Sequence, residues 1–155
     1  MNIQRHFTVS VYIVHKDKLL LHLHKRSKIM LPLGGHIEVN ELPEEACIRE
    51  AKEESGLNIS LHNSDINKLL RSSSELTVEK VLINPMHTVL CKVNSEHYHI
   101  DFVYYATAKS FETKREEGES NLLKWVAKEE LKDVINIPHN VLVMANEALE
   151  LLTIR

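Results

Sequence analysis

The 155-residue chain has little of several features that mark particular classes of protein. It has only two cysteines, Cys47 and Cys91, which is too few for a disulfide framework and favours a reducing compartment. No apolar run reaches the roughly 20 residues that a membrane-spanning helix needs. The start, MNIQRHF, is not typical of a signal peptide. These absences predict a cytoplasmic protein without a membrane partner.

Strong positive charge, internal repeats and low-complexity linkers are also missing. The formal net charge is -3, which argues against broad nucleic-acid binding through neutralisation of phosphates. The hydrophobic fraction of 43% and the charged fraction of 26% are ordinary for a globular protein. We therefore expect residues 1–155 to form a single domain with its own core, and the oligomeric state stays open.

Alternation of apolar and polar residues predicts strands on both sides of a central helical segment. The first two strands should form a hairpin, because a charged turn separates them. The expected strands are residues 6–15, 19–25, 75–83, 86–93, 97–108 and 122–127. Apolar residues at helical spacing predict a last helix from Pro138 onward. This order of elements indicates an α/β domain with a mixed sheet covered on both faces.

The central helical segment is glutamate-rich and lies within GGHIEVNELPEEACIREAKEESGL, residues 34–57. Pro43 suits the first turn of a helix, and Gly56 suits the left-handed residue that ends one. Between them, Glu50, Glu53 and Glu54 stand at i, i+3 and i+4 and so share one face.

Like charges at this spacing repel by roughly 0.2–0.5 kcal/mol per pair. One interpretation is a solvated acidic face whose repulsion is relieved by Arg49, Lys52 and salt. The other is a site for a hard divalent cation such as Mg²⁺, which binds carboxylates and is shared with substrate phosphates. Gly34 and Gly35 lie just upstream, where backbone can approach a ligand closely. Spacing and charge alone leave both interpretations open.

Ten histidines are also present, and two pairs alternate along expected strands. His22 and His24 form one pair, His97 and His99 form the other, and Asp101 continues the second row. Neutral imidazoles bind zinc well, so a zinc site is one interpretation. We favour the other, in which these are polar members of half-buried strands or substrate contacts, because no recognised zinc spacing occurs.

The glutamate-rich stretch resembles the signature of the Nudix hydrolases, G-x5-E-x7-R-E-U-x-E-E-x-G-U, where U is aliphatic. The residues in register are Gly35, Glu41, Arg49, Glu50, Glu53, Glu54, Gly56 and Leu57. Two positions depart from the usual pattern: Ala51 is smaller than the usual aliphatic residue, and Asn40 replaces a glycine often seen there. The resemblance implies the Nudix-type α/β/α sandwich with a mixed β-sheet.

The same resemblance implies hydrolysis of a phosphoanhydride in a nucleoside diphosphate linked to a further group, with Mg²⁺ or Mn²⁺ as cofactor. It assigns Glu50, Glu53 and Glu54 as metal ligands, with the carbonyl of Gly35 as a further ligand. It makes Arg49 the residue that orients the glutamates, and Glu41 the support of the loop before the helix.

The resemblance leaves two candidates for the general base of this reaction. One is Glu50, and the other is a glutamate of residues 116–119, because the family commonly takes an acidic group from this region. Glu119 is preferred within that loop, since it follows Gly118 and precedes a strand. The alternative for the loop is an ordinary solvated surface.

The substrate is less constrained by the sequence. Residues 71–74 lack the proline typical of the ADP-ribose branch, and the signatures of the NADH and coenzyme A branches are absent. A nucleoside triphosphate is therefore favoured, followed by a nucleotide sugar. Strand faces suggest pocket residues, which are Tyr12, His22, His24, His99 and Tyr105. The charged loop at residues 26–28 adds Arg26 as a phosphate contact, with a solvated loop as the alternative. Two other functions stay open: a non-catalytic nucleotide sensor, and a small protein that holds zinc or manganese.

Overall fold

The computed structural model describes residues 3–63, 78–119 and 122–153, and these form a mixed sheet with a helix on each face. The strands are β1 (Gln4–His15), β2 (Lys18–Leu23), β3 (Met30–Leu31), β4 (Leu33–His36), β5 (Ile59–Leu61), β6 (His87–Lys92), β7 (His97–Ala108) and β8 (Leu123–Ala127). The helices are α1 (Pro43–Ser55), the 3₁₀ helix η2 (Lys128–Asp133) and α3 (His139–Leu152).

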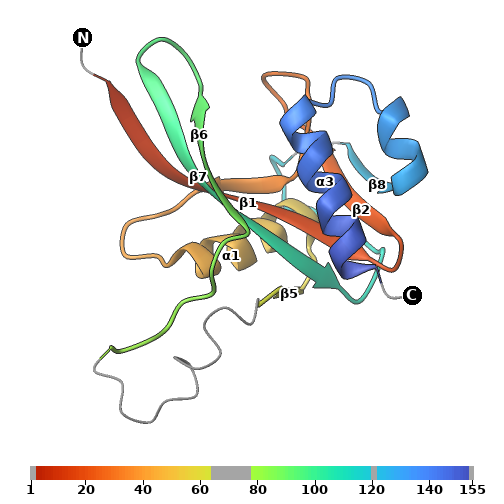
Figure 1. Ribbon diagram of the computed structural model, residues 1–155, viewed down its shortest axis with the longest axis horizontal. Helices are drawn as coiled ribbons and strands as arrows, with labels where there is room; N and C mark the ends of the chain where they lie inside the picture. Colours follow the sequence, from red (N-terminus) through yellow and green to blue (C-terminus); the bar gives the residue numbers. More distant parts are fainter. Residues whose placement is uncertain (1–2, 64–77, 120–121, 154–155) are drawn as a thin grey trace.

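The centre of the sheet is a parallel pair, β1 and β7, which run side by side through the middle of the molecule (Figure 1). All other strand pairs are antiparallel: β2 and β4 pair with β1, β5 and β6 pair with β7, and β3 and β8 pair with β2. The mixed sheet expected from the sequence is therefore confirmed.

Side chains of β1 and β7 alternate between two separate cores. Val9, Val11 and Ile13 pack with α1 on one face, whereas Tyr12 and Val14 pack with α3 on the other. In β7, Val103 and Tyr105 likewise belong to the α3 face. Two helices on opposite faces of the sheet give the expected α/β/α layers. Among the described residues, no helix has both the length and the apolar character needed to cross a membrane.

One expected strand is wrong in the part that the structure describes. We expected residues 75–83 to be extended and paired, but residues 78–83 form no strand, and residues 75–77 lie outside the described ranges. The polar groups of this segment bind a helix instead: the backbone N–H of Ile83 and the ammonium of Lys80 donate to the carboxylate of Glu44 in α1. The carbonyl of Ile83 accepts the hydroxyl of Tyr104. The spacing of Ile66, Leu69 and Leu70 also suggests a helical turn, but these residues lie outside the described ranges.

The two glycines before α1 lie in a strand that the sequence did not reveal. Residues 33–36 form β4, and Gly34 and Gly35 pair with Ser10 and Val9 of β1. Gly34 has φ 150°, and a Cβ there would lie 2.1 Å from the carbonyl oxygen of Val9. A glycine is therefore required for β4 to approach β1, and the chain leaves this strand directly into the loop before α1.

Candidate active site

Helix α1 begins and ends where the sequence predicts. Pro43 occupies the first turn, and the carboxylate of Glu45 accepts a hydrogen bond from the N–H of Leu42 at 3.0 Å. Gly56 ends the helix at φ 74°, and its N–H donates to the carbonyl of Lys52. These two limits fix the rotation of the helix, so that Arg49 and the glutamates of its next turn face the glycines of β4.

Arg49 is the centre of the acidic face, which we define as Glu41, Glu50, Glu53 and Glu54. Its guanidinium makes a two-bond contact with Glu41, Nε to Oε1 at 2.8 Å and one terminal nitrogen to Oε2 at 3.0 Å. The other terminal nitrogen donates to Glu50 at 2.7 Å and to Glu53 at 3.1 Å. Arg49 therefore makes a bidentate pair, and its partner is Glu41.

The same guanidinium also joins the helix to β4 and its loop. It donates to the backbone carbonyl of His36 at 3.0 Å, and Glu41 accepts the N–H of Glu38 at 2.9 Å. The hydrogen bonds from Arg49 and from the Glu38 N–H hold the pKa of Glu41 below its ordinary value, against a smaller opposing effect of burial. Glu41 is thus a charged anchor of the loop rather than a group free to take up a proton.

Glu50 lies directly against Gly35. A Cβ at position 35 would come within 2.3 Å of Oε1 of Glu50, so this carboxylate occupies space that only a glycine leaves open. Burial raises the pKa of Glu50, although the contacts with Arg49 oppose that shift. The backbone of Gly35 and the carboxylate of Glu50 are therefore neighbours, as a shared metal site would require.

Glu54 is the most buried carboxyl group of the acidic face, with a side chain 8% exposed. It accepts the backbone N–H of Gly34 at 2.8 Å and lies 3.4 Å from Nδ1 of His22. Burial raises the pKa of Glu54 to about 8, with further contributions from Glu50, Glu119 and Glu53. Burial also lowers the pKa of His22 to about 4. Both groups are thus driven to their neutral forms, and the contact between them is not an ion pair at neutral pH.

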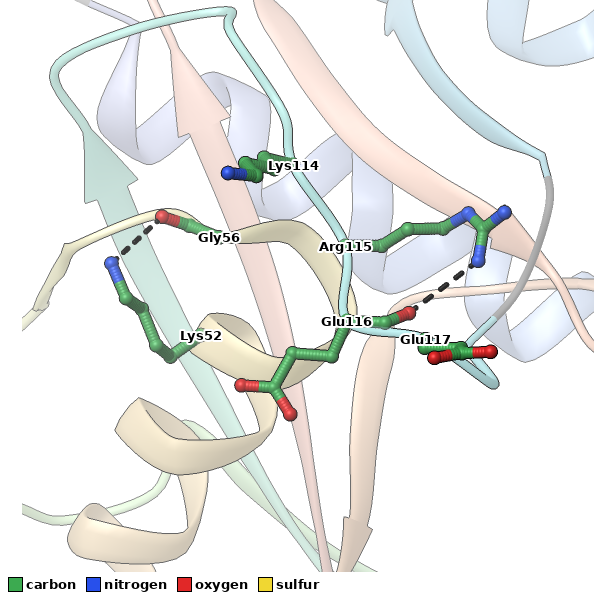
Figure 2. A pocket seen from close by; sticks show the side chains of 6 residues that line it. All are labelled: Lys52, Gly56, Lys114, Arg115, Glu116 and Glu117. Carbon is green, nitrogen blue, oxygen red and sulfur yellow. Dashed lines mark hydrogen bonds between the residues drawn. The ribbon is translucent and has the colours of Figure 1, made fainter.

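The loop after β7 crosses the C-terminal end of α1. The N–H of Lys114 donates to the carbonyl of Ser55 at 2.7 Å, and the N–H of Glu116 donates to the carbonyl of Glu53 at 2.8 Å. Figure 2 shows loop residues 114–117 beside Lys52 and Gly56, with which they line a pocket of about 500 Å³. The loop is therefore attached to the helix that carries the glutamates.

Glu119 is the residue that this loop brings to the acidic face. Its charge is close enough to raise the pKa values of both Glu50 and Glu54. Gly118 has φ 97°, so the sharp turn expected there is present. Glu119 is half-buried, whereas Glu116 and Glu117 are exposed. Of the three glutamates, Glu119 has the surroundings that suit a group acting on the acidic face.

The residues suggested for a substrate pocket divide between the two faces of the sheet. His22 contacts Glu54 on the α1 face, and the His24 ring lies 6.2 Å from the His22 ring. Arg26 is exposed in the turn that follows β2. His22 thus contacts the acidic face directly, and all three remain predicted substrate contacts.

The other pocket candidates lie on the α3 face. Tyr12 and Tyr105 are fully buried, and the hydroxyl of Tyr105 donates to Glu147 of α3 at 2.8 Å. His99 lies among other histidines at the far end of β7. The sheet separates these residues from Glu50, Glu53 and Glu54, so one compact pocket does not unite the whole set.

The donor set of the acidic face fits a hard divalent cation. It offers the carboxylates of Glu50, Glu53 and Glu54 and the nearby backbone of Gly35, all oxygen ligands. Burial is the main cause of the raised pKa of Glu54, and the charges of Glu50, Glu119 and Glu53 add to it. A bound cation would oppose both effects. Arg49 already pairs with Glu50 and Glu53, but a single guanidinium charge does not balance the four glutamates and Glu119.

Comparisons with known proteins agree with this geometry. The sequence matches the family described as NUDIX domain over residues 4–144. The chain is similar to the crystal structure of a NUDIX family hydrolase from Clostridium perfringens, at 67% identity, with 97% of this chain and 99% of that chain covered and a TM-score of 0.89. A search of curated proteins returned no similar sequence.

Two more distant structures share the fold. A NUDIX hydrolase from Nitrosomonas europaea is 16% identical, with 96% of this chain and 90% of that chain covered and a TM-score of 0.68. A UDP-X diphosphatase is 18% identical, with 98% of this chain and 63% of that chain covered and a TM-score of 0.57. The family match, the close structural relative and the arginine-centred acidic face together show that this chain is a hydrolase that belongs to the Nudix family.

Proposed function

We propose that this Nudix hydrolase is a Mg²⁺-dependent pyrophosphohydrolase whose favoured substrate is a nucleoside triphosphate, with Mn²⁺ as an alternative cofactor. The observation that carries the proposal is the convergence of Glu50, Glu53 and Glu54 beside Gly35, with Arg49 holding two of the three. Nudix family members act on small nucleotide derivatives and generally use divalent ions, and the intact acidic face fits that activity.

In the proposed reaction, water adds across a phosphoanhydride bridge and yields a nucleoside monophosphate and pyrophosphate. When bound, the divalent cation supplies neutralisation of phosphate charge and a lower pKa for a bound water. The protein's part is to hold its groups in place. Arg49 fixes Glu50 and Glu53 relative to each other, and Glu41 fixes Arg49 against the loop.

Glu119 is the proposed general base, which accepts the proton of the attacking water. It reaches the acidic face from a separate loop. Within the described residues, Arg49 makes no hydrogen bond with Glu119, so the Glu119 carboxylate is not already engaged there. Glu50 is the second candidate, but its Oε1 already accepts a hydrogen bond from Arg49 at 2.7 Å. A base with its own position separates proton transfer from cation binding.

A nucleotide sugar is the second candidate substrate, because one structure with the same fold is that of a UDP-X diphosphatase. A third possibility, a non-catalytic nucleotide sensor, is disfavoured because every glutamate of the family signature is present. Each of them is held by Arg49 or by a backbone N–H.

The test is a product assay on metal-depleted protein with a panel of nucleoside triphosphates and UDP-sugars, each with and without Mg²⁺. We expect a triphosphate to give equal amounts of nucleoside monophosphate and pyrophosphate, with no turnover until Mg²⁺ is added. Faster turnover of a UDP-sugar than of any triphosphate would make a nucleotide sugar the favoured substrate instead. Nucleotide binding without any hydrolysis at saturating Mg²⁺ would overturn the enzymatic proposal. Ca²⁺ is a useful control, since its looser coordination should allow binding but little turnover.

A further inference from the structure

Four histidines meet on the face of the sheet opposite the acidic face. They are His6 of β1, His36 at the end of β4, and His97 and His99 of β7, which we call the histidine cluster. One ring nitrogen from each lies within 4.8 Å of the corresponding nitrogens of the other three.

The strand register explains why these rings meet. In the parallel β1–β7 pair, His6 lies opposite His99, and in the antiparallel β1–β4 pair, His36 lies opposite Thr8, the next residue of β1 on the same face. His97 precedes His99 by two residues and therefore shares its face. Three strands thus place four imidazoles on neighbouring positions of one surface. Figure 1 shows this end of the sheet, where β1 starts beside the β6–β7 hairpin, extending beyond α3.

The separations suit a four-coordinate metal centre. Tetrahedral bonds of about 2.0–2.1 Å to imidazole place the ligand nitrogens roughly 3.4 Å apart. Nδ1 of His6 and Nε2 of His36 are already 3.4 Å apart, and one ring nitrogen from each of the four lies within 4.8 Å of the others. The rings of His97 and His99 are 4.8 Å apart and steeply inclined, so they converge rather than stack.

Two of the four imidazoles have a buried ring nitrogen that makes no hydrogen bond within the described residues. Nε2 of His97 and Nε2 of His99 are buried, and within the described part of the chain neither has a hydrogen-bond partner. Buried ring nitrogens are normally satisfied. Burial, together with the neighbouring histidines, lowers the pKa values of His36 and His99, which keeps them in the neutral form that binds metal.

A fixed negative charge lies beside the histidine cluster. Asp101 follows His99 by two residues on the same face and is only 8% exposed. Its two carboxylate oxygens accept the hydroxyls of Thr8 and Ser10, both at 2.7 Å. Hydroxyl groups are neutral donors, so Thr8 and Ser10 orient the Asp101 carboxylate without balancing its charge. A cation held by the four imidazoles would supply that balance.

We propose that the histidine cluster is a second metal site, which holds one Zn²⁺ or a similar borderline divalent ion such as Co²⁺ through His6, His36, His97 and His99. Imidazole ligands discriminate against Mg²⁺, which prefers oxygen, so this site and the acidic face take different ions. Four protein ligands close a tetrahedral centre, which is the pattern of a structural site rather than a catalytic one.

The position of His36 gives the bound ion a structural effect on the rest of the protein. The His36 side chain belongs to the histidine cluster, and its backbone carbonyl accepts a hydrogen bond from Arg49. An ion at the cluster would therefore join the start of β1, the end of β4 and β7, and would hold the backbone to which Arg49 is attached. This inference does not depend on which nucleotide the enzyme hydrolyses.

The test is a titration of metal-depleted protein with Co²⁺ in excess Mg²⁺, which occupies oxygen-ligand sites. We expect one Co²⁺ per chain with the intense visible absorption of tetrahedral cobalt. At a hundredfold excess of Zn²⁺ over Kd, the Tm should rise by roughly 5–10 °C. The double variant His97→Gln/His99→Gln should lose both effects, and the matched variant His139→Gln, at the exposed start of α3, should keep them.

Equal cobalt binding by the wild type and the double variant would overturn the proposal, as would a weak six-coordinate spectrum or no binding by folded wild type. If the double variant does not fold, His6→Gln decides the question, because His6 is exposed at the start of β1 and its folding can be checked by circular dichroism. A His6→Gln protein that keeps the tetrahedral spectrum would exclude the four-histidine site.

Discussion

The acidic face and the histidine cluster lie on opposite faces of one sheet, and they are built in opposite ways. The acidic face takes its four glutamates from one short segment, residues 41–54, and it contains a permanent cation, Arg49. The histidine cluster takes its side chains from three strands between residues 6 and 99, and two of its buried ring nitrogens have no hydrogen-bond partner within the described residues.

This difference teaches how each site behaves without its ligand. Arg49 balances part of the acidic charge, so we expect the acidic face to keep its geometry with or without a bound cation. Within the described residues, no side chain links the histidines as Arg49 links the glutamates. A metal ion bound there would therefore take that place and become part of the fold. We therefore expect changes at the acidic face to alter turnover, and changes at the histidine cluster to alter metal content and stability.

Replacement of Glu119 by glutamine should give the largest effect and would isolate proton transfer from cation binding. We expect turnover to fall by roughly 10²–10⁴-fold, the usual contribution of a positioned base, with little change in Mg²⁺ affinity. Steady-state kinetics and a Mg²⁺ titration measure the two quantities. Glu112→Gln, in an exposed part of the same loop, is the matched control. Near-normal turnover in Glu119→Gln would show that Glu119 is not the base and that the loop is an ordinary solvated surface.

Replacement of Glu53 by glutamine should be nearly as damaging, but through the cation. We expect turnover to fall by roughly 10²–10³-fold, as when one electrostatic group of an active site is removed. Mg²⁺ affinity should fall with it. The free energy of unfolding without metal should change by no more than about 0.5 kcal/mol, because a repulsion and a contact with Arg49 are lost together. Glu129→Gln, exposed in η2, is the control, and a large loss of Tm in metal-free Glu53→Gln would indicate a structural role instead.

Arg49→Lys keeps the charge of the acidic face and removes the fork that spans Glu41, Glu50 and Glu53. We expect a loss of turnover of about 10–100-fold, typical of a group that orients ligands. Metal-free protein should lose about 1.5–3 kcal/mol of stability, the contribution of one charged hydrogen bond. Chemical denaturation and kinetics on the same sample check both numbers. Unchanged turnover and stability in Arg49→Lys would mean that a positive charge at this position is enough to organise the glutamates.

A smaller effect is expected on the α3 face, at Glu147. Burial opposes ionisation there, but hydrogen bonds from Tyr105 and His87 together lower the pKa of Glu147 below 4.5. The stability that this carboxylate contributes is therefore present above its unfolded pKa and is lost as pH falls through the folded value. Glu147→Gln should decline less steeply than wild type in denaturation experiments below about pH 4.5. Parallel acid profiles would show that the three side chains are not coupled.

The acidic face was predictable because its geometry is local. Helix periodicity alone puts Glu50, Glu53 and Glu54 on one face, and Pro43 and Gly56 fix the ends of the helix. The role of Arg49 also followed from its register in the family signature. What the sequence did not reveal is that Arg49 also donates to the carbonyl of His36, because a backbone contact leaves no mark on residue type.

The histidine cluster was visible only in part. The alternation of His97 and His99 was apparent, but the absence of a recognised zinc spacing argued against a site. That rule describes ligands close in sequence, whereas His6 and His36 join the pair only through the register of β1 with β7 and β4. Strand order is set by long-range packing, and short-range alternation carries no information about it. The expected strand at 78–83 failed for a similar reason, since buried Glu44 binds that segment.

The parallel pairing of β1 with β7 has a consequence for how the chain becomes a protein. The two strands are 93 positions apart along the chain, as for Thr8 and Asp101, and contacts of such long range form slowly. During synthesis, the β1–β2 hairpin and α1 leave the ribosome long before their central partner exists. A chain truncated ahead of β7 would lack both the strand that pairs with β1 and helix α3, so the apolar side chains of β1 on the α3 face would be uncovered. The first half of this protein therefore completes its core only after residues 97–108 and α3 have been made.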